Sequence, residues 1–141
     1  MILNIITYGH PVLRRHGRRI EKITPEIKAL AADMLETLSA VRGAGLAAQQ
    51  VGHDLQLEII DIRSAEVLSR LWFSGIEVSP ADYMPLVLIN PEVVLAGKQE
   101  LKSEGCLSFP GVSATVSRYP CASVAALNLK GEPVRFECEG F

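Results

Sequence analysis

The segment that decides the fold starts at Thr24 and reads TPEIKALAADMLETLSAVRG, residues 24–43. Thr24 is a good N-cap, Pro25 suits the first helical turn, and Glu26 complements the positive end of the helix dipole. Apolar residues recur at spacings of three and four, which marks one buried face: Ile27, Leu30, Ala31, Met34, Leu35, Leu38 and Val41. We therefore predict one long amphipathic helix that ends at Gly43.

The remainder of the chain has the patterns of strands and turns. Residues 1–23 read as an irregular or short-stranded arm, and residues 62–85 as a loop or hairpin insertion between strands. Alternating or continuous apolar runs predict strands at 55–61, 86–89, 93–95, 112–116, 122–129 and 134–138, with a turn at Lys130-Gly131. This order predicts an α+β fold in a single domain, residues 1–141, with the long helix packed on mostly antiparallel strands.

Composition excludes several classes of protein. The chain has 141 residues, of which 48% are hydrophobic, and a mean hydropathy of +0.22, as expected for a globule with a real core. A net charge of -2 gives no reason to expect direct nucleic-acid binding, and no apolar run approaches the roughly 20 residues of a membrane span. Three widely spaced cysteines and the absence of a signal peptide favour a cytoplasmic location.

Two short stretches carry the candidate chemistry. The first is GAGLAAQQ, residues 43–50, which has neither the lysine of a P-loop nor the third glycine of a dinucleotide site. The second is EGCLSFPG, residues 104–111, which places Cys106 after a glycine and before a Pro-Gly turn. The residues alone leave three roles open for Cys106: a metal ligand, a nucleophile, or a buried structural thiol.

These two stretches, in this order, resemble the first and second motifs of the peptide deformylases. The opening YGHPVLR, residues 8–14, is similar to the N-terminal segment of that family. The resemblance covers nearly the whole chain and implies hydrolysis of the formyl group at the N-terminus of new polypeptides.

The resemblance implies a metal site and an oxyanion site. Cys106 matches the thiolate ligand of the family metal, which is Fe²⁺ or Zn²⁺ as a substitute. The side chain of Gln50 and the backbone N–H of Leu107 match the donors that stabilise the oxyanion as water attacks the formyl carbon.

The resemblance also implies how the peptide is held. Gly45 and Gly105 match positions that flank the bound peptide as strand edges, and Ala44 matches the lining of the methionine pocket. Glu104 matches a carboxylate behind the metal ligand, and Arg118 is its expected partner.

The sequence has no His-Glu-x-x-His motif, which in this family supplies two further metal ligands and the catalytic glutamate. No pair among His10, His16 and His53 has the required spacing. We therefore expect that the chain is C-terminally incomplete, lacks the metal-binding helix, retains no metal and is inactive. Two other interpretations remain: a non-catalytic relative that binds peptide or ribosome, and a cysteine enzyme with Cys106 as nucleophile.

Two further expectations follow. Without a covering helix, apolar residues on one face of the sheet should be partly exposed, such as Leu127, Leu129, Val134 and Phe136. The basic run at residues 14–19 is either a nucleic-acid or ribosome contact or an ordinary solvated surface.

Overall fold

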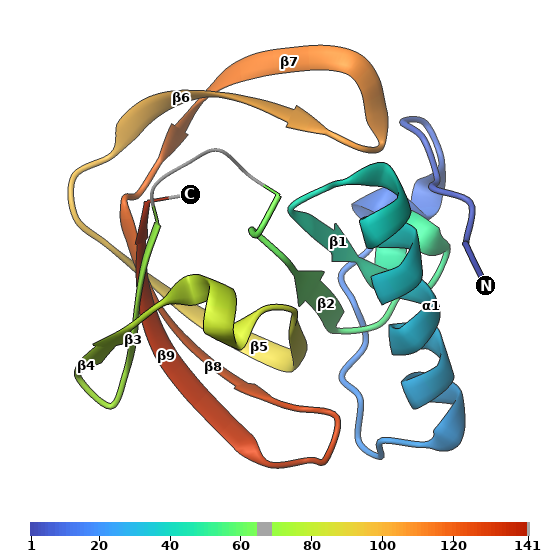
Figure 1. Cartoon of the computed structure of the whole chain (residues 1–141). Coiled ribbons are helices and arrows are strands. Elements are labelled where there is room, and N and C mark those ends of the chain that lie inside the picture. Colours follow the sequence, from blue (N-terminus) through green and yellow to red (C-terminus); the bar gives the residue numbers. More distant parts are fainter. Residues whose placement is uncertain (65–68, 141) are drawn as a thin grey trace.

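The computed structural model describes residues 1–64 and 69–140 and is shown in Figure 1. Within these residues a seven-stranded sheet has the order β1-β2-β5-β8-β9-β3-β4, and β6 and β7 form a separate hairpin. Every pairing of strands is antiparallel. The strands are β1 Gly45–Ala47, β2 Leu57–Ile60, β3 Ser69–Phe73, β4 Ile76–Val78, β5 Leu86–Ala96, β6 Glu100–Cys106, β7 Phe109–Arg118, β8 Cys121–Leu127 and β9 Pro133–Gly140. With helix α1, Pro25–Val41, this confirms the predicted α+β class.

Helix α1 begins as predicted and ends slightly earlier. The Thr24 hydroxyl accepts a hydrogen bond of 3.3 Å from the N–H of Ile27, which caps the helix. The helix ends at Val41 and not at the predicted Gly43, and the residue that caps it, Arg42, is left-handed with φ of 52°. A Cβ at Gly43 would lie 2.8 Å from Leu38 Cδ1 and 3.0 Å from Leu107 Cδ1, so these two methyl groups would have to shift.

The main core lies between α1 and the β1–β2 end of the sheet. Its largest fully buried side chains are Met34, Leu38, Leu46, Leu57, Ile59 and Ile89. Thr37 is buried among them, and its hydroxyl donates to the Asp33 carbonyl at 2.7 Å and accepts from Leu3 N at 2.8 Å. Both hydrogen-bonding capacities of that hydroxyl are therefore used, so its burial carries no unpaired polar group.

Strand β5 is one continuous strand, where the sequence predicted two that are separated at Asn90-Pro91. The register shifts between Ile89 and Glu92, which is a bulge, and Asn90 has φ of 52°. A proline is tolerated at a bulge because the ladder is already interrupted there. The strand therefore bends at this point and continues.

Residues 69–78 form a hairpin. This confirms one of the two predictions for residues 62–85, which were a loop or a hairpin insertion. Strand β3 pairs with β4 and also with β9, so this hairpin extends the main sheet. Residues 65–68 of the predicted insertion lie outside the described residues.

A second core corrects the expected exposure of the far strands. Phe136 is only 6% exposed and packs in a cluster with Leu71, Leu88, Val124 and Ala126. Its ring lies 5.7 Å from that of Phe73, and Val134 packs on the same cluster. Leu127 and Leu129 pack against the α1 core. The predicted exposure was therefore wrong for Phe136, which this cluster buries, while Leu127, Leu129 and Val134 are partly exposed.

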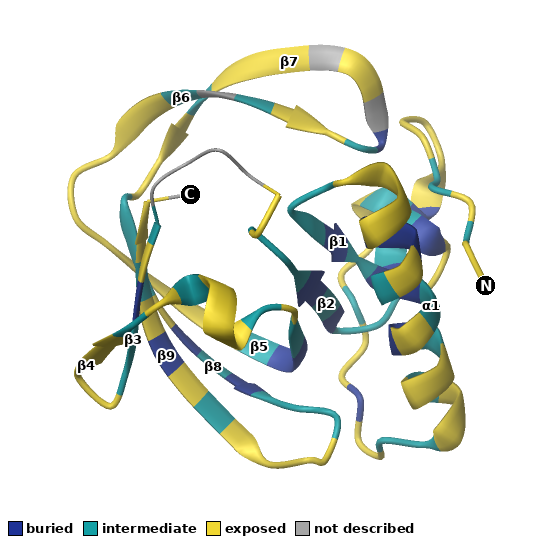
Figure 2. Ribbon diagram, viewed as in Figure 1, coloured by how far each residue is buried: buried dark blue, intermediate teal, exposed yellow. Residues whose placement is uncertain are grey.

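The β6–β7 hairpin arches away from the sheet at the top of Figure 1, and most of its described residues are exposed in Figure 2. The sequence pattern predicted β7 only in part and did not predict β6, whose residues do not alternate between apolar and polar. The hairpin turn carries Leu107 and Ser108, directly after Cys106 at the end of β6. The position of this hairpin brings residues 104–111, which contain Cys106, over β1.

Glu58 is a mostly buried carboxylate on β2 and makes no ion pair among the described residues. It lies opposite Ala47 and Leu88 in the strand register. Burial raises the pKa of Glu58 above that of an ordinary glutamate, because desolvation disfavours the charged form. The folded protein therefore holds this proton to higher pH than the unfolded chain does.

We expect Glu58→Gln to raise the melting temperature at pH 7 and to leave it unchanged at pH 3. The cost of the charge is absent below the ordinary glutamate pKa of about 4.3 and grows as pH rises from there to the raised folded-state value. Thermal unfolding at both pH values measures this, with the exposed Glu100→Gln as control. An equal shift at pH 3 and pH 7 would mean that the charge is not the cause.

Candidate active site

One hollow of about 660 Å³ brings together most of the residues that the two motifs nominate. Its wall contains Ala44, Gly45, Gln50, Gly105, Cys106 and Leu107. The first three belong to β1 and its flanks, and the other three belong to the end of β6 and the turn after it. Segments about 60 residues apart in the sequence therefore face each other across this hollow.

The side chain of Gln50 connects the two walls. Its Oε1 accepts from the N–H of Ala47 at 3.0 Å, so the amide orientation is fixed. Its Nε2 then points across the hollow and donates to Ser108 Oγ at 3.3 Å and toward Cys106 Sγ at 3.7 Å. An amide N–H held in this way is available to a carbonyl oxygen that enters beside the thiol.

Ser108 is a site residue that the sequence analysis did not assign. It is 2% exposed, and its hydroxyl is an acceptor for the Gln50 amide. Its backbone carbonyl accepts from Tyr8 N at 2.9 Å, and the carbonyl of Gln50 accepts from Ile6 N at 2.7 Å. The N-terminal arm therefore ties both motifs together through backbone bonds. The position of Ser108 inside the second motif was the only signal in the sequence.

Strand β1 has an open edge toward the hollow. The carbonyl of Ala44 accepts from Asp61 N at 2.8 Å, and Leu46 lies opposite Ile59, so these residues face β2. Because backbone groups alternate along an antiparallel strand, the N–H and C=O of Gly45 point the other way. Gly45 therefore presents a donor and an acceptor to a chain that lies beside β1.

Comparison with known proteins agrees with this geometry. The profile described as polypeptide deformylase matches residues 2–141. The chain belongs to the polypeptide deformylase family. It is 42% identical to a peptide deformylase of Methylacidiphilum infernorum over 141 residues, which are 100% of this chain and 74% of that protein. It is 38% identical to a peptide deformylase of Aquifex aeolicus, covering 100% of this chain and 76% of that one.

Solved deformylases share the fold. A peptide deformylase from Legionella pneumophila superposes with a TM-score of 0.84 at 31% identity, covering 100% of this chain and 74% of that one. A peptide deformylase from Synechococcus elongatus in complex with actinonin superposes with a TM-score of 0.82 at 34% identity, covering 99% and 66%. The family resemblance, and the assignment to a class of metal-dependent hydrolases, are thereby confirmed.

Glu104 and Arg118 form a bidentate ion pair on the β6–β7 hairpin. Arg118 Nη2 lies 3.0 Å from Glu104 Oε1, and Arg118 Nε lies 3.1 Å from Oε2. The pair joins the two strands and does not line the hollow. It is largely solvent-exposed, so its contribution to stability is small, and its role behind Cys106 stays a prediction.

The donor set in the hollow does not make a metal site of the deformylase kind by itself. Cys106 contributes one thiolate, while the described residues contain no group of three His, Cys, Asp or Glu side chains that could hold an ion. His10 is engaged elsewhere, since its Nδ1 accepts from Val12 N at 3.2 Å. A divalent metal in a protein normally has three or four protein ligands. We therefore derive no chemical step through a metal.

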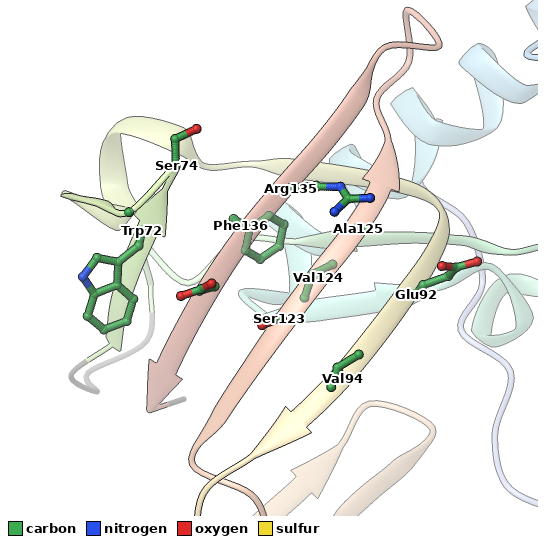
Figure 3. Close-up of a pocket in the computed structure, with 11 residues that line it drawn as sticks. Trp72, Ser74, Glu92, Val94, Ser123, Val124, Ala125, Arg135 and Phe136 are labelled. Atoms are coloured by element: carbon green, nitrogen blue, oxygen red, sulfur yellow. The ribbon is translucent and has the colours of Figure 1, made fainter.

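A different hollow, of about 520 Å³, lies over the sheet and holds none of the nominated deformylase residues. Figure 3 shows its wall, which strands β3, β5, β8 and β9 supply, with Trp72, Glu92 and Arg135 among the lining residues. It contains no cysteine. The hollow beside Cys106 is therefore the candidate active site.

Proposed function

We propose that the hollow at Cys106 binds the formylated N-terminus of a nascent polypeptide and forms the peptide-binding part of a peptide deformylase active site. The observation that carries the proposal is the Gln50 amide, which Ala47 fixes and which is directed at Cys106 beside the open edge of β1. Family membership supports the reaction class, hydrolysis of a formyl amide.

The residues present have definite tasks in this proposal. The Gln50 Nε2 and the Leu107 N–H donate to the formyl oxygen and stabilise negative charge as it develops there. The peptide pairs with the backbone of Gly45 and is bordered on its other side by Gly105, as in strand addition to a sheet edge. Ala44 leaves room for the methionine side chain. Glu104 and Arg118 hold the cysteine-bearing strand in place from outside the hollow.

Binding of a formyl-methionyl-alanyl-alanine peptide tests the proposal. We expect saturable binding that weakens about tenfold or more when the formyl group is replaced by a free amine, because the acceptor is lost and an ammonium group must be desolvated. Isothermal titration of both peptides measures the ratio. Equal affinity for the two peptides would contradict the proposed role of the hollow.

For metal and turnover, we expect that these 141 residues alone hold well below one iron or zinc ion per chain. We also expect no deformylation of the same peptide above a Cys106→Ala control. The reason is the single thiolate ligand described above. Elemental analysis and a formate-release assay measure both quantities. One tightly bound ion per chain that is lost in Cys106→Ser, or turnover lost in Cys106→Ala, would show that further ligands are supplied.

The remaining partners are proposed on the same basis. In the described residues no helix is both long and apolar enough to cross a membrane. We propose a cytoplasmic location, where formylated nascent chains are made, and a ribosome contact through the exposed Arg15 and Arg19 of the arm. In the described part of the chain the Cys106 thiol contacts the Gln50 amide and no imidazole, so a cysteine-nucleophile mechanism has no support.

A further inference from the structure

A second hollow, of about 760 Å³, adjoins the candidate active site at Gly43. One wall is the C-terminal end of α1, with Leu38, Ser39 and Arg42, and the other comes from the segment after β2, with Asp61, Arg63 and Ser64. Gly43 lines both hollows, so both border the segment that leads into β1.

The charged groups of this hollow are not equivalent. The carboxylate of Asp61 is held by Arg63, with Arg63 Nη2 2.6 Å from Oδ2 and Nε 2.9 Å from Oδ1. Glu36 is held by the ammonium group of Met1 at 2.6 Å. Arg42 makes no ion pair among the described residues and is exposed. Among the described charged side chains that line this hollow, Arg42 is therefore the one that remains available to a ligand.

The direction of a bound peptide follows from the positions of Gln50 and Gly45. Strand β1 runs from Gly45 to Ala47, and Gln50 lies beyond its C-terminal end. A peptide whose formyl group is at Gln50 and Cys106 must run from there past Gly45 toward Gly43, antiparallel to β1. An extended chain advances about 3.3 Å per residue, so its third and fourth residues reach the level of Arg42.

We propose that the hollow at Arg42 is a subsite for an acidic side chain at the third or fourth residue of the formylated peptide. This inference rests on the proposed function, since it takes the formyl end to be at Gln50. The guanidinium of Arg42 would pair with the incoming carboxylate, and the hydroxyls of Ser39 and Ser64 line the same hollow as further donors. Because Arg42 is exposed, the expected preference is modest, about three- to fivefold.

Four peptides and two variants test the subsite. The peptides are formyl-methionyl-alanine followed by two glutamates, two glutamines or two lysines, each with an amidated C-terminus, and the glutamate peptide without its formyl group. Arg42→Asn removes the charge while asparagine still tolerates the left-handed backbone at this position, where φ is 52°. Arg135→Asn is the matched control, because it removes an exposed arginine from the hollow over the sheet.

We expect the formylated glutamate peptide to bind about three- to fivefold more tightly than the glutamine peptide, and the lysine peptide to bind least tightly. The preference should disappear in Arg42→Asn, persist in Arg135→Asn, and shrink as salt is raised. Equal affinities for the glutamate and glutamine peptides, with formyl dependence intact, would overturn the subsite alone. Affinities that do not depend on the formyl group would overturn the proposed function and the subsite with it.

Discussion

Asn90→Ala is expected to lower the free energy of unfolding by about 3–5 kcal/mol. The Asn90 amide is buried and connects β5 to the N-terminal arm: its Nδ2 donates to the Ile20 carbonyl at 2.7 Å, and its Oδ1 accepts from Ile20 N at 2.8 Å. Alanine leaves two buried backbone groups unpaired, at roughly 1–3 kcal/mol each. It also places a Cβ-bearing residue with no polar side chain at φ of 52°.

Urea denaturation of Asn90→Ala and Asn90→Gly separates the two causes. Glycine tolerates the left-handed backbone but also lacks the amide, so its loss should be smaller than that of alanine by about 1–2 kcal/mol. A loss below about 1 kcal/mol in Asn90→Ala would show that the connection to Ile20 is replaced by water at little cost.

Gln50→Ala is expected to weaken the binding of formyl-methionyl-alanyl-alanine about tenfold or more. The substitution removes the donor to the formyl oxygen. It also leaves the Ala47 N–H and the buried Ser108 hydroxyl without the partner that each now has. Titration of the native chain and the variant with the same peptide gives the ratio directly.

Gln49→Ala is the matched control for this effect. Gln49 is the same residue type one position earlier, but its amide donates to the Arg15 carbonyl at 3.4 Å and does not enter the hollow. Its affinity for the peptide should equal that of the native chain. If both variants bound like the native chain, Gln50 would have no part in recognising the formyl group.

The elements that local patterns determine were predictable from the sequence. Helix α1 follows from its cap and its apolar spacing, and β8 and β9 follow from runs of apolar residues with a turn between them. The continuity of β5 was not predictable, because the bulge at Asn90 depends on a bond to Ile20, 70 residues away. Strand β6 was missed because it belongs to an exposed hairpin and has no buried face to impose alternation.

The motifs of the site were predictable from the sequence, but the backbone hydrogen bonds that hold them in place were not. The two motifs nominated Gln50, Cys106 and their neighbours, and the fold brings them to one hollow. The bonds from Ile6 and Tyr8 to the two motifs use only backbone atoms, so no residue type marks them in the sequence. The end of the helix was assigned to Gly43, since glycine commonly ends helices, whereas the left-handed capping residue is Arg42.

The most direct test of the central claim is an NMR titration of the ¹⁵N-labelled chain with formyl-methionyl-alanyl-alanine. We predict that the largest shifts fall on the backbone amides of Gly45, Gly105 and Leu107 and on the side-chain amide of Gln50, all of which line one hollow. Shifts concentrated instead around Trp72, Ser123 and Arg135, in the hollow over the sheet, would contradict the assignment of the active site.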